Sequence, residues 1–176
     1  FTIANSMRRG LDRGEFRLYY QPKLDVTSDC IVATEALVRW QHPELGLLAP
    51  TEFIQLAEES GLIVDLGEWV LREACRQNMV WHRDGMQGLR VAVNLSGYQL
   101  QHSRLVETVR AILDETGMPG ELLEFEITES VIMQNPDYAV EVLNEISSLG
   151  IHISIDDFGT GYSSLSHLKR FSINTL

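Results

Sequence analysis

The amino-acid sequence predicts an α/β fold in which a parallel sheet closes into a barrel. Short runs rich in β-branched residues alternate with amphipathic stretches at helical spacing, as in a parallel sheet with helical crossovers. Within these runs, large apolar residues alternate with small or polar ones, so one face of the sheet is polar. The length of 176 residues fits one domain and allows a substantial core.

Six runs have the composition expected of strands, and turn-forming residues flank most of them. They cover residues 16–21, 31–39, 90–95, 122–128, 151–156 and, as the opening of a further strand, 173–176. Because they are short and mostly separated by helical segments, we expect them to lie side by side in one sheet.

Four stretches have the spacing of amphipathic helices. They begin near residues 51, 65, 103 and 136, and three of them end at Gly61, Gly117 and Gly150. The second is expected to start at Asp65, since Glu68 three residues later would complete a capping box. These stretches are the predicted crossovers between parallel strands.

The alternation within the strands decides between an open sheet and a barrel. Ile151, Ile153 and Ile155 alternate with His152 and Ser154, and the runs at 91–95 and 123–128 behave in the same way. A strand covered by helices on both faces of an open sheet would be apolar at nearly every position. One polar face instead favours a TIM-type barrel with a polar site in its interior.

A barrel of this type typically needs about 250 residues. The predicted fold class is therefore a modified TIM-type (β/α)8 barrel, truncated here at about the start of the sixth strand. We expect the missing units downstream. The first residue is Phe1, with neither Met nor a secretory leader, so we expect any targeting or membrane segment upstream.

Composition excludes several classes of function. The net charge of -11 argues against binding of duplex nucleic acid, which requires a basic face. No apolar run approaches the roughly 20 residues of a membrane-spanning helix. Cys30 and Cys75 form no Cys-x-x-Cys pair, so we expect reduced, structural thiols in a cytoplasmic domain.

Polar side chains follow the apolar residues of four predicted strands. They are Glu35, Asn94, Glu126, Asp156 and Asp157. Such barrels keep their active sites at the carboxyl ends of the strands, so these side chains should converge there. Four carboxylates without a cation would repel one another, and oxygen-only donors suit Mg²⁺ or Mn²⁺ rather than zinc.

Two such ions are the usual means of cleaving a phosphodiester. The adjacent Asp156 and Asp157 could hold the second ion. Each of these residues, taken singly, could instead be a strand-end cap or a loop anchor. That alternative is less convincing because a polar residue recurs at the same place in four consecutive strands. In the stretch 156–164, Gly159 and Gly161 suit either an ordinary turn or a loop that closes over a ligand.

Two further polar residues are weaker candidates. Arg39 has the same strand parity as Glu35 and could grip a phosphate oxygen, or could form a surface ion pair. Gln21 could touch a ligand base or anchor the turn before Pro22. None of the five histidines has metal-ligand spacing.

The motifs as a whole resemble the EAL-domain family of bacterial cyclic di-GMP phosphodiesterases. The similarity rests on Glu35-Ala36-Leu37, Tyr20-Gln21-Pro22, Gln41-His42-Pro43, Asn94-Leu95-Ser96, Glu126-Ile127-Thr128-Glu129-Ser130 and the stretch 156–164. It covers essentially the whole chain, so residues 1–176 are expected to be one EAL-type phosphodiesterase domain.

The resemblance implies a modified TIM barrel that uses two Mg²⁺ or Mn²⁺ ions to hydrolyse cyclic di-GMP to linear pGpG. By position, the expected metal ligands are Glu35, Asn94, Glu126 and Asp156, with Asp156 and Asp157 serving the second ion. Glu129 matches the glutamate that positions the loop after Asp157. Gln21, Leu37 and Arg39 match substrate contacts.

The resemblance also leaves questions open. The family's lysine that helps activate water is expected immediately after Leu176, with a further metal-binding glutamate beyond it. If both were degenerate, the protein would be a receptor that binds cyclic di-GMP without hydrolysis. A barrel enzyme acting on another phosphate ester is a third alternative. Family members often dimerise, so a homodimer is expected, as are sensory or synthase domains in the parent chain.

Overall fold

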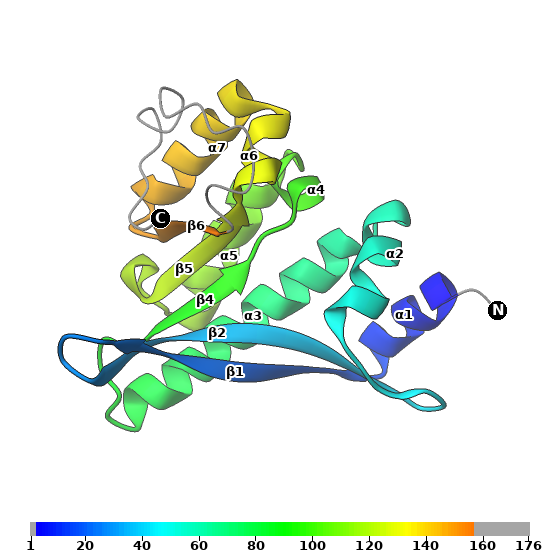
Figure 1. Cartoon of the computed structure of the whole chain (residues 1–176), viewed down its shortest axis with the longest axis horizontal. Helices are drawn as coiled ribbons and strands as arrows, with labels where there is room; N and C mark the ends of the chain where they lie inside the picture. Colours follow the sequence, from blue (N-terminus) through cyan, green and yellow to red (C-terminus); the bar gives the residue numbers. More distant parts are fainter. Residues whose placement is uncertain (1–2, 157–176) are drawn as a thin grey trace.

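A computed structural model of the chain describes residues 3–156, with two layers, a curved sheet and the helices that cover it (Figure 1). The strands are β1 (Phe16–Asp25), β2 (Cys30–His42), β3 (Gly46–Leu48), β4 (Arg90–Asn94), β5 (Leu123–Thr128) and β6 (His152–Asp156). The helices are α1 (Ile3–Asp12), α2 (Ile54–Glu59), α3 (Ile63–Arg83), α4 (Gly97–Leu100), α5 (Leu105–Thr116), α6 (Glu129–Gln134) and α7 (Pro136–Ser148), with 3₁₀ turns at Pro50–Glu52 and Gly120–Leu122.

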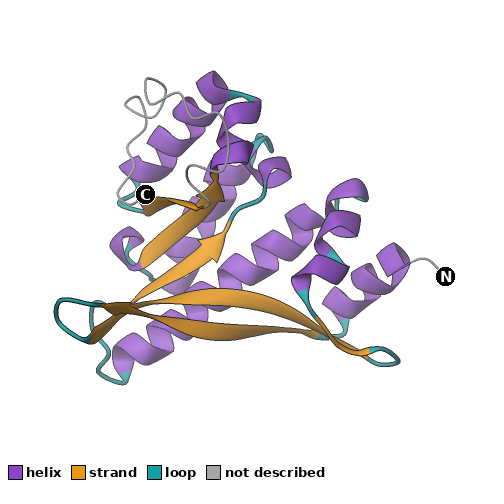
Figure 2. Ribbon diagram, viewed as in Figure 1, coloured by secondary structure: helices purple, strands orange, loops and turns teal. Residues whose placement is uncertain are grey.

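The sheet has the strand order β1-β2-β4-β5-β6, with β3 paired to β2. β2, β4, β5 and β6 are parallel, as the sequence predicts. The expectation that all the strands point the same way is wrong for β1, which is antiparallel to β2 (Figure 2).

The cause of this reversal is the short link between β1 and β2. Asp25 accepts hydrogen bonds from the backbone N–H of Thr27 at 2.9 Å and from the hydroxyl of Ser28 at 2.8 Å, and Asp29 has a φ of 54°. A connection this short can join only antiparallel neighbours, since a parallel pair needs a crossover of a dozen or more residues.

The alternation of apolar and polar residues divides the sheet into two faces, as predicted. Strand register places Gln21, Glu35 and Ala92 in one row across β1, β2 and β4, and Asn94 beside Glu126 of β5. Every second residue of the parallel strands belongs to this polar face, and β1 follows the same alternation up to Lys23, where its register shifts. The opposite face is apolar and packs against helices.

The core lies between the apolar face and the helices α3, α5 and α7, which Figure 1 shows on the same side of the sheet. At the β1–β2 end, the rings of Phe16 and Trp40 stack with centroids 5.3 Å apart, and Phe53 meets Phe16 edge-on at 5.8 Å. All three side chains are fully buried. Burial of large aromatic rings is a major source of stability, so this cluster secures the β1–β2 pair to the helical layer.

The helix predictions are confirmed in position and corrected at one boundary. α3 begins at Ile63, with Leu62 before it and no side-chain cap, so the capping box predicted at Asp65 is wrong. Gly61, with a φ of +74°, ends α2 and lets the next helix start at once. Burial of Ile63 and Leu66 then outweighs the missing cap.

Several short elements have no counterpart in the sequence prediction, namely α1, α4, α6 and β3. These elements are brief or lie outside the strand–helix alternation, so hydrophobic periodicity does not indicate them. The strand expected at 173–176 lies outside the described residues.

Two expectations from composition can be compared with the structure. Within residues 3–156, no helix combines the length and hydrophobicity needed to cross a membrane. Both cysteines are free thiols, and Cys75 is buried as expected of a structural thiol, whereas Cys30 is exposed and the structural role expected for it is wrong.

Candidate metal and substrate site

The polar face brings Glu35 and Asn94 into direct contact. Glu35 lies within β2, at the last part of its parallel pairing with β4, rather than at the end of the strand. Asn94, the last residue of β4, donates a hydrogen bond from Nδ2 to Glu35 Oε1 at 2.8 Å. The amide oxygen of Asn94 therefore stays available as a donor to a cation.

Glu126 lies beside Asn94 in the parallel register of β4 and β5. Its carboxylate forms an ion pair with the ammonium of Lys23 from β1. Burial raises the pKa of Glu126, and the neighbouring carboxylates of Glu35 and Glu124 add to the rise, although Lys23 opposes it. A partly buried carboxylate next to other carboxylates is a site that favours a bound cation.

A second buried carboxylate, that of Glu124, lies two residues before Glu126 on the same face of β5. The carboxylate of Glu124 accepts a hydrogen bond from the Ser154 hydroxyl at 2.7 Å and lies 3.4 Å from Lys23 Nζ. Arg90 Nε lies 3.5 Å from Glu124 Oε2, so the two side chains form an ion pair. The Nε–H group of Arg90 has no hydrogen-bond acceptor among the described residues. Burial raises the pKa of Glu124, but Ser154 and the two cations outweigh it and hold that pKa below its ordinary value.

The remaining predicted acids lie at the edge of this arrangement. Asp156 ends β6 opposite Thr128 of β5, and it is exposed. Glu129 is buried at the first position of α6. Asp157 lies outside the described residues, as do Gly159 and Gly161, so the structure does not test the second part of the predicted ligand set.

The donors fit a hard divalent cation. Within residues 3–156, no three acidic, His or Cys side chains converge closely enough to hold a metal ion by themselves. Glu35 and Asn94 are already in contact, however, and Glu126 pairs with Asn94 in the parallel register of β4 and β5. Because these donors are all oxygen, they match Mg²⁺ or Mn²⁺. Their role as metal ligands stays a prediction.

The predicted substrate contacts lie around the same acids. Leu37 lines an open pocket together with Asn94 and Glu126, with further walls from α2 and α3. Gln21 is exposed and pairs with Glu35 across the antiparallel strands. Arg39 donates to the carbonyl of Val38 at 2.8 Å and lies over the ring of Tyr19, 6.0 Å from its centroid. The predicted phosphate contact of Arg39 is untested.

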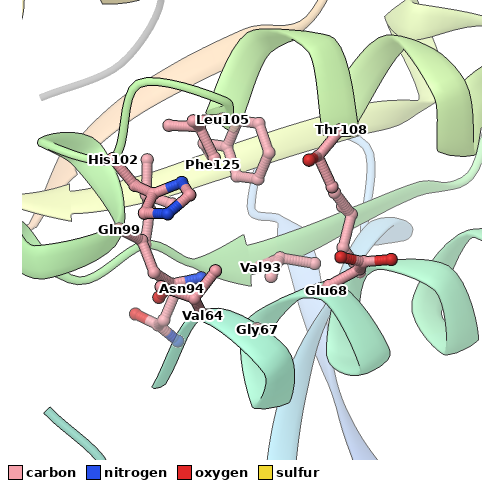
Figure 3. Close-up of a pocket in the computed structure, with 12 residues that line it drawn as sticks. Val64, Gly67, Glu68, Val93, Asn94, Gln99, His102, Leu105, Thr108 and Phe125 are labelled. Carbon is pink, nitrogen blue, oxygen red and sulfur yellow. The ribbon is translucent and has the colours of Figure 1, made fainter. Parts of the chain in front are cut away.

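A second pocket lies behind Asn94, between α3 and the segment that follows β4 (Figure 3). Gln99 of α4 exchanges hydrogen bonds with Ser96, each at 3.2 Å, which fixes the chain just after Asn94. A Cβ on Gly67 would lie 1.9 Å from Gln99 Nε2, so only glycine lets Gln99 lie against α3 in this way. Gly67, Gln99 and Asn94 all line this pocket.

Sequence reasoning missed Lys23, Glu124 and this Gly67–Gln99 contact. The alternation at 123–128 already places Glu124 on the polar face with Glu126, but it assigns Glu124 no role. Lys23 has the strand parity of Gln21 but lies beyond the predicted strand 16–21. No local signal indicates that Lys23 and Glu126 meet, because β2 and β4 lie between their strands.

The sequence matches the EAL domain family over residues 4–176. The chain belongs to the EAL domain family. This confirms the predicted resemblance, and with it the modified TIM-type barrel as the fold class. The described strands form part of that barrel, with the polar face as its interior.

Two curated relatives and one solved structure illustrate the similarity. The chain is 45% identical over 175 residues to the bifunctional diguanylate cyclase/cyclic di-GMP phosphodiesterase MucR of Pseudomonas aeruginosa, covering 99% of this chain and 25% of MucR. It is 42% identical over 174 residues to the cyclic di-GMP phosphodiesterase PdeR of Escherichia coli, covering 99% and 26%. The chain thus spans about a quarter of the length of these relatives.

The solved structure is the PaMucR phosphodiesterase in complex with c-di-GMP. It superimposes with a TM-score of 0.95 at 44% identity, covering 99% of this chain and 70% of that one. The described architecture is therefore that of a known EAL domain.

Proposed function

We propose that this EAL domain hydrolyses cyclic di-GMP to linear pGpG and so lowers the level of a bacterial second messenger. The observation that carries the proposal is the contact between Glu35 and Asn94 on the polar face, with Glu126 as the neighbour of Asn94 in register. Relatives at 42% and 45% identity are named as cyclic di-GMP phosphodiesterases, which supports this substrate.

The proposed catalytic residues are Glu35, Glu129, Asp156 and Asp157. All of them except Glu129 would also help to hold two Mg²⁺ or Mn²⁺ ions. Glu35, Asn94, Glu126 and Asp156 would supply oxygen ligands, with Asp156 and Asp157 serving the second ion. Metal ions held by these residues would supply Lewis-acid chemistry for the activation of water and for the neutralisation of charge on the phosphate. The Asn94–Glu35 hydrogen bond orients the Glu35 carboxylate before any ion arrives.

Substrate binding is assigned to residues on the same face. Leu37 would pack against a guanine ring from the wall of the open pocket. Arg39 would turn its planar fork to a phosphate, and Gln21, next to Glu35, would contact the nucleotide. Glu129 would position the loop that follows Asp157.

The proposed setting is a cytoplasmic domain within a larger protein. Relatives four times as long as this chain support additional sensory or synthase domains. A homodimer formed through the barrel is part of the same proposal. The net charge of -11 is unfavourable for duplex nucleic acid and does not oppose a small ligand held through metal ions.

The test is turnover of cyclic di-GMP by the full-length protein with Mn²⁺ or Mg²⁺, followed by separation of the products. Glu35→Ala should abolish pGpG formation. Glu107→Ala, which removes an exposed carboxylate on α5, is the matched control and should leave turnover unchanged. Normal turnover by Glu35→Ala contradicts the assignment, and tight binding without hydrolysis by the wild type would favour a receptor.

A further inference from the structure

Lys23 reaches across the interior of the sheet to a proposed metal ligand. Its strand, β1, is separated from β5 by β2 and β4. Neighbouring strands lie about 4.8 Å apart, so β1 and β5 would be roughly 14 Å apart in a flat sheet, well beyond the length of a lysine side chain. The Lys23–Glu126 ion pair therefore depends on the curvature of the sheet.

The surroundings of Lys23 are suited to a cation held in the interior. The residue opposite it on β2 is Ala33, which is small and fully buried, so the lysine stem has room to cross. The side chain of Lys23 is 32% exposed and that of Glu126 is 11% exposed, so salt screens the pair only in part. Burial opposes the charged form of Lys23, but its hydrogen bonds and charge interactions with Glu126 and Glu124 together outweigh burial and raise its pKa.

We propose that Lys23 is the resident counter-cation of the metal site, which neutralises Glu126 in the metal-free protein and has to release it when a divalent ion binds. Lys23 thereby sets the affinity of the site for metal. This inference rests on the proposed function, since it takes Glu126 to be a metal ligand.

Glu124 gives Lys23 a second position. Its carboxylate is 3.4 Å from Lys23 Nζ, and Ser154 and Arg90 hold it in place. When a divalent ion takes Glu126, the ammonium can stay paired with Glu124 and needs no large movement of β1. Glu124 is not among the proposed metal ligands, so it remains available in both states.

Removal of the ammonium changes the two states in opposite directions. Without Lys23, the metal-free site holds Glu35 and Glu126 without this counter-charge, so the metal-free form is less stable. The metal-bound form loses a repulsion between Lys23 and the ion. Both changes favour metal, and we expect Lys23→Met to lower the Kd for Mn²⁺ by about tenfold, within the usual range of coupling between two sites.

The experiment is a titration of the full-length protein with Mn²⁺, with free Mn²⁺ followed by electron paramagnetic resonance. Arg8→Met is the control, because it removes an equal charge from an exposed ion pair with Asp65 on the helical side. The inference expects tighter binding by Lys23→Met and an unchanged Kd for Arg8→Met. It also expects Lys23→Met to unfold at a lower temperature than the wild type without metal, and a smaller difference at saturating Mn²⁺.

An unchanged or raised Kd for a natively folded Lys23→Met protein overturns the inference and leaves the proposed function intact. If Lys23→Met does not fold, Lys23→Arg serves instead. Its guanidinium fork should hold Glu126 and Glu124 together and raise the Kd severalfold, so an unchanged Kd overturns the inference. The proposed function requires a saturable Mn²⁺ site in the wild type that is lost in Glu126→Gln. If the wild type has no such site, the metal-dependent proposed function is overturned, and the inference with it.

Discussion

Glu124 offers a quantitative test of how the polar interior is stabilised. Its side chain is 7% exposed and contacts Ser154, Lys23 and Arg90. Truncation by Glu124→Ala removes the acceptor of the Ser154 hydroxyl and leaves two cations without one of their partners. The structure therefore predicts a loss of stability that a surface glutamate would not cause.

The magnitude follows from the individual contacts. A hydrogen bond to a charged group contributes about 1.5–3 kcal/mol. The side chains of Arg90 and Lys23 are 31% and 32% exposed, so each of these long ion pairs contributes at most about 1 kcal/mol. We expect Glu124→Ala to lower the free energy of unfolding by about 3 kcal/mol. Glu124→Gln keeps an acceptor for Ser154 and should cost about half as much.

The measurement is urea unfolding followed by tryptophan fluorescence, with Glu107→Ala as the exposed control. The folded-state pKa of Glu124 lies below its ordinary value of 4.5, so its ionised form stabilises the fold above that pH. The difference between wild type and Glu124→Gln should therefore be full at neutral pH and shrink as the pH falls through the lower, folded-state pKa. A cost below about 1 kcal/mol for Glu124→Ala, or equal costs for both variants, would refute the reasoning.

Two further predictions concern packing. A Cβ at Gly120 would lie 2.0 Å from the carbonyl oxygen of Leu149, so Gly120→Ala should cost about 2–3 kcal/mol in thermal or urea unfolding. Gly97→Ala meets only side-chain ends at 3.3 Å or more and should cost little; equal effects of the two would contradict this account. Burial raises the pKa of the Cys75 thiol to about 12, so at pH 8 a maleimide should label Cys30 and spare Cys75 until the protein is unfolded, as peptide mass spectrometry can show. Rapid labelling of Cys75 in the folded protein would disprove its burial.

The strands were predictable because their alternation is a local property. The run predicted at 151–156 corresponds to β6 (His152–Asp156), and the polar face follows from counting every second residue. The α3 boundary was not predictable from its capping pattern. Ile63 and Leu66 are buried in the hydrophobic core, and this tertiary packing outweighs the local preference for a cap at Asp65.

The candidate site divides in a similar way. Motif and parity together placed Glu35, Asn94 and Glu126 on one face, and the structure brings them side by side. Whether they bind metal remains a prediction. The direction of β1 was predicted wrongly because β1 and β2 were assumed to be parallel like the later strands. The link between them is too short for the crossover that parallel strands need.

By itself, the sequence determined the family, the alternation of the main strands and helices, and the face to which the residues of the predicted parallel strands belong. Those properties depend on periodicity and motif spacing, which neighbouring residues carry along the chain. The tertiary structure alone decided that Lys23 meets Glu126. Their strands are separated by two others, and only the curvature of the sheet brings them together. A contact of that kind arises from the curvature that several strands build up together, so no local stretch of sequence encodes it.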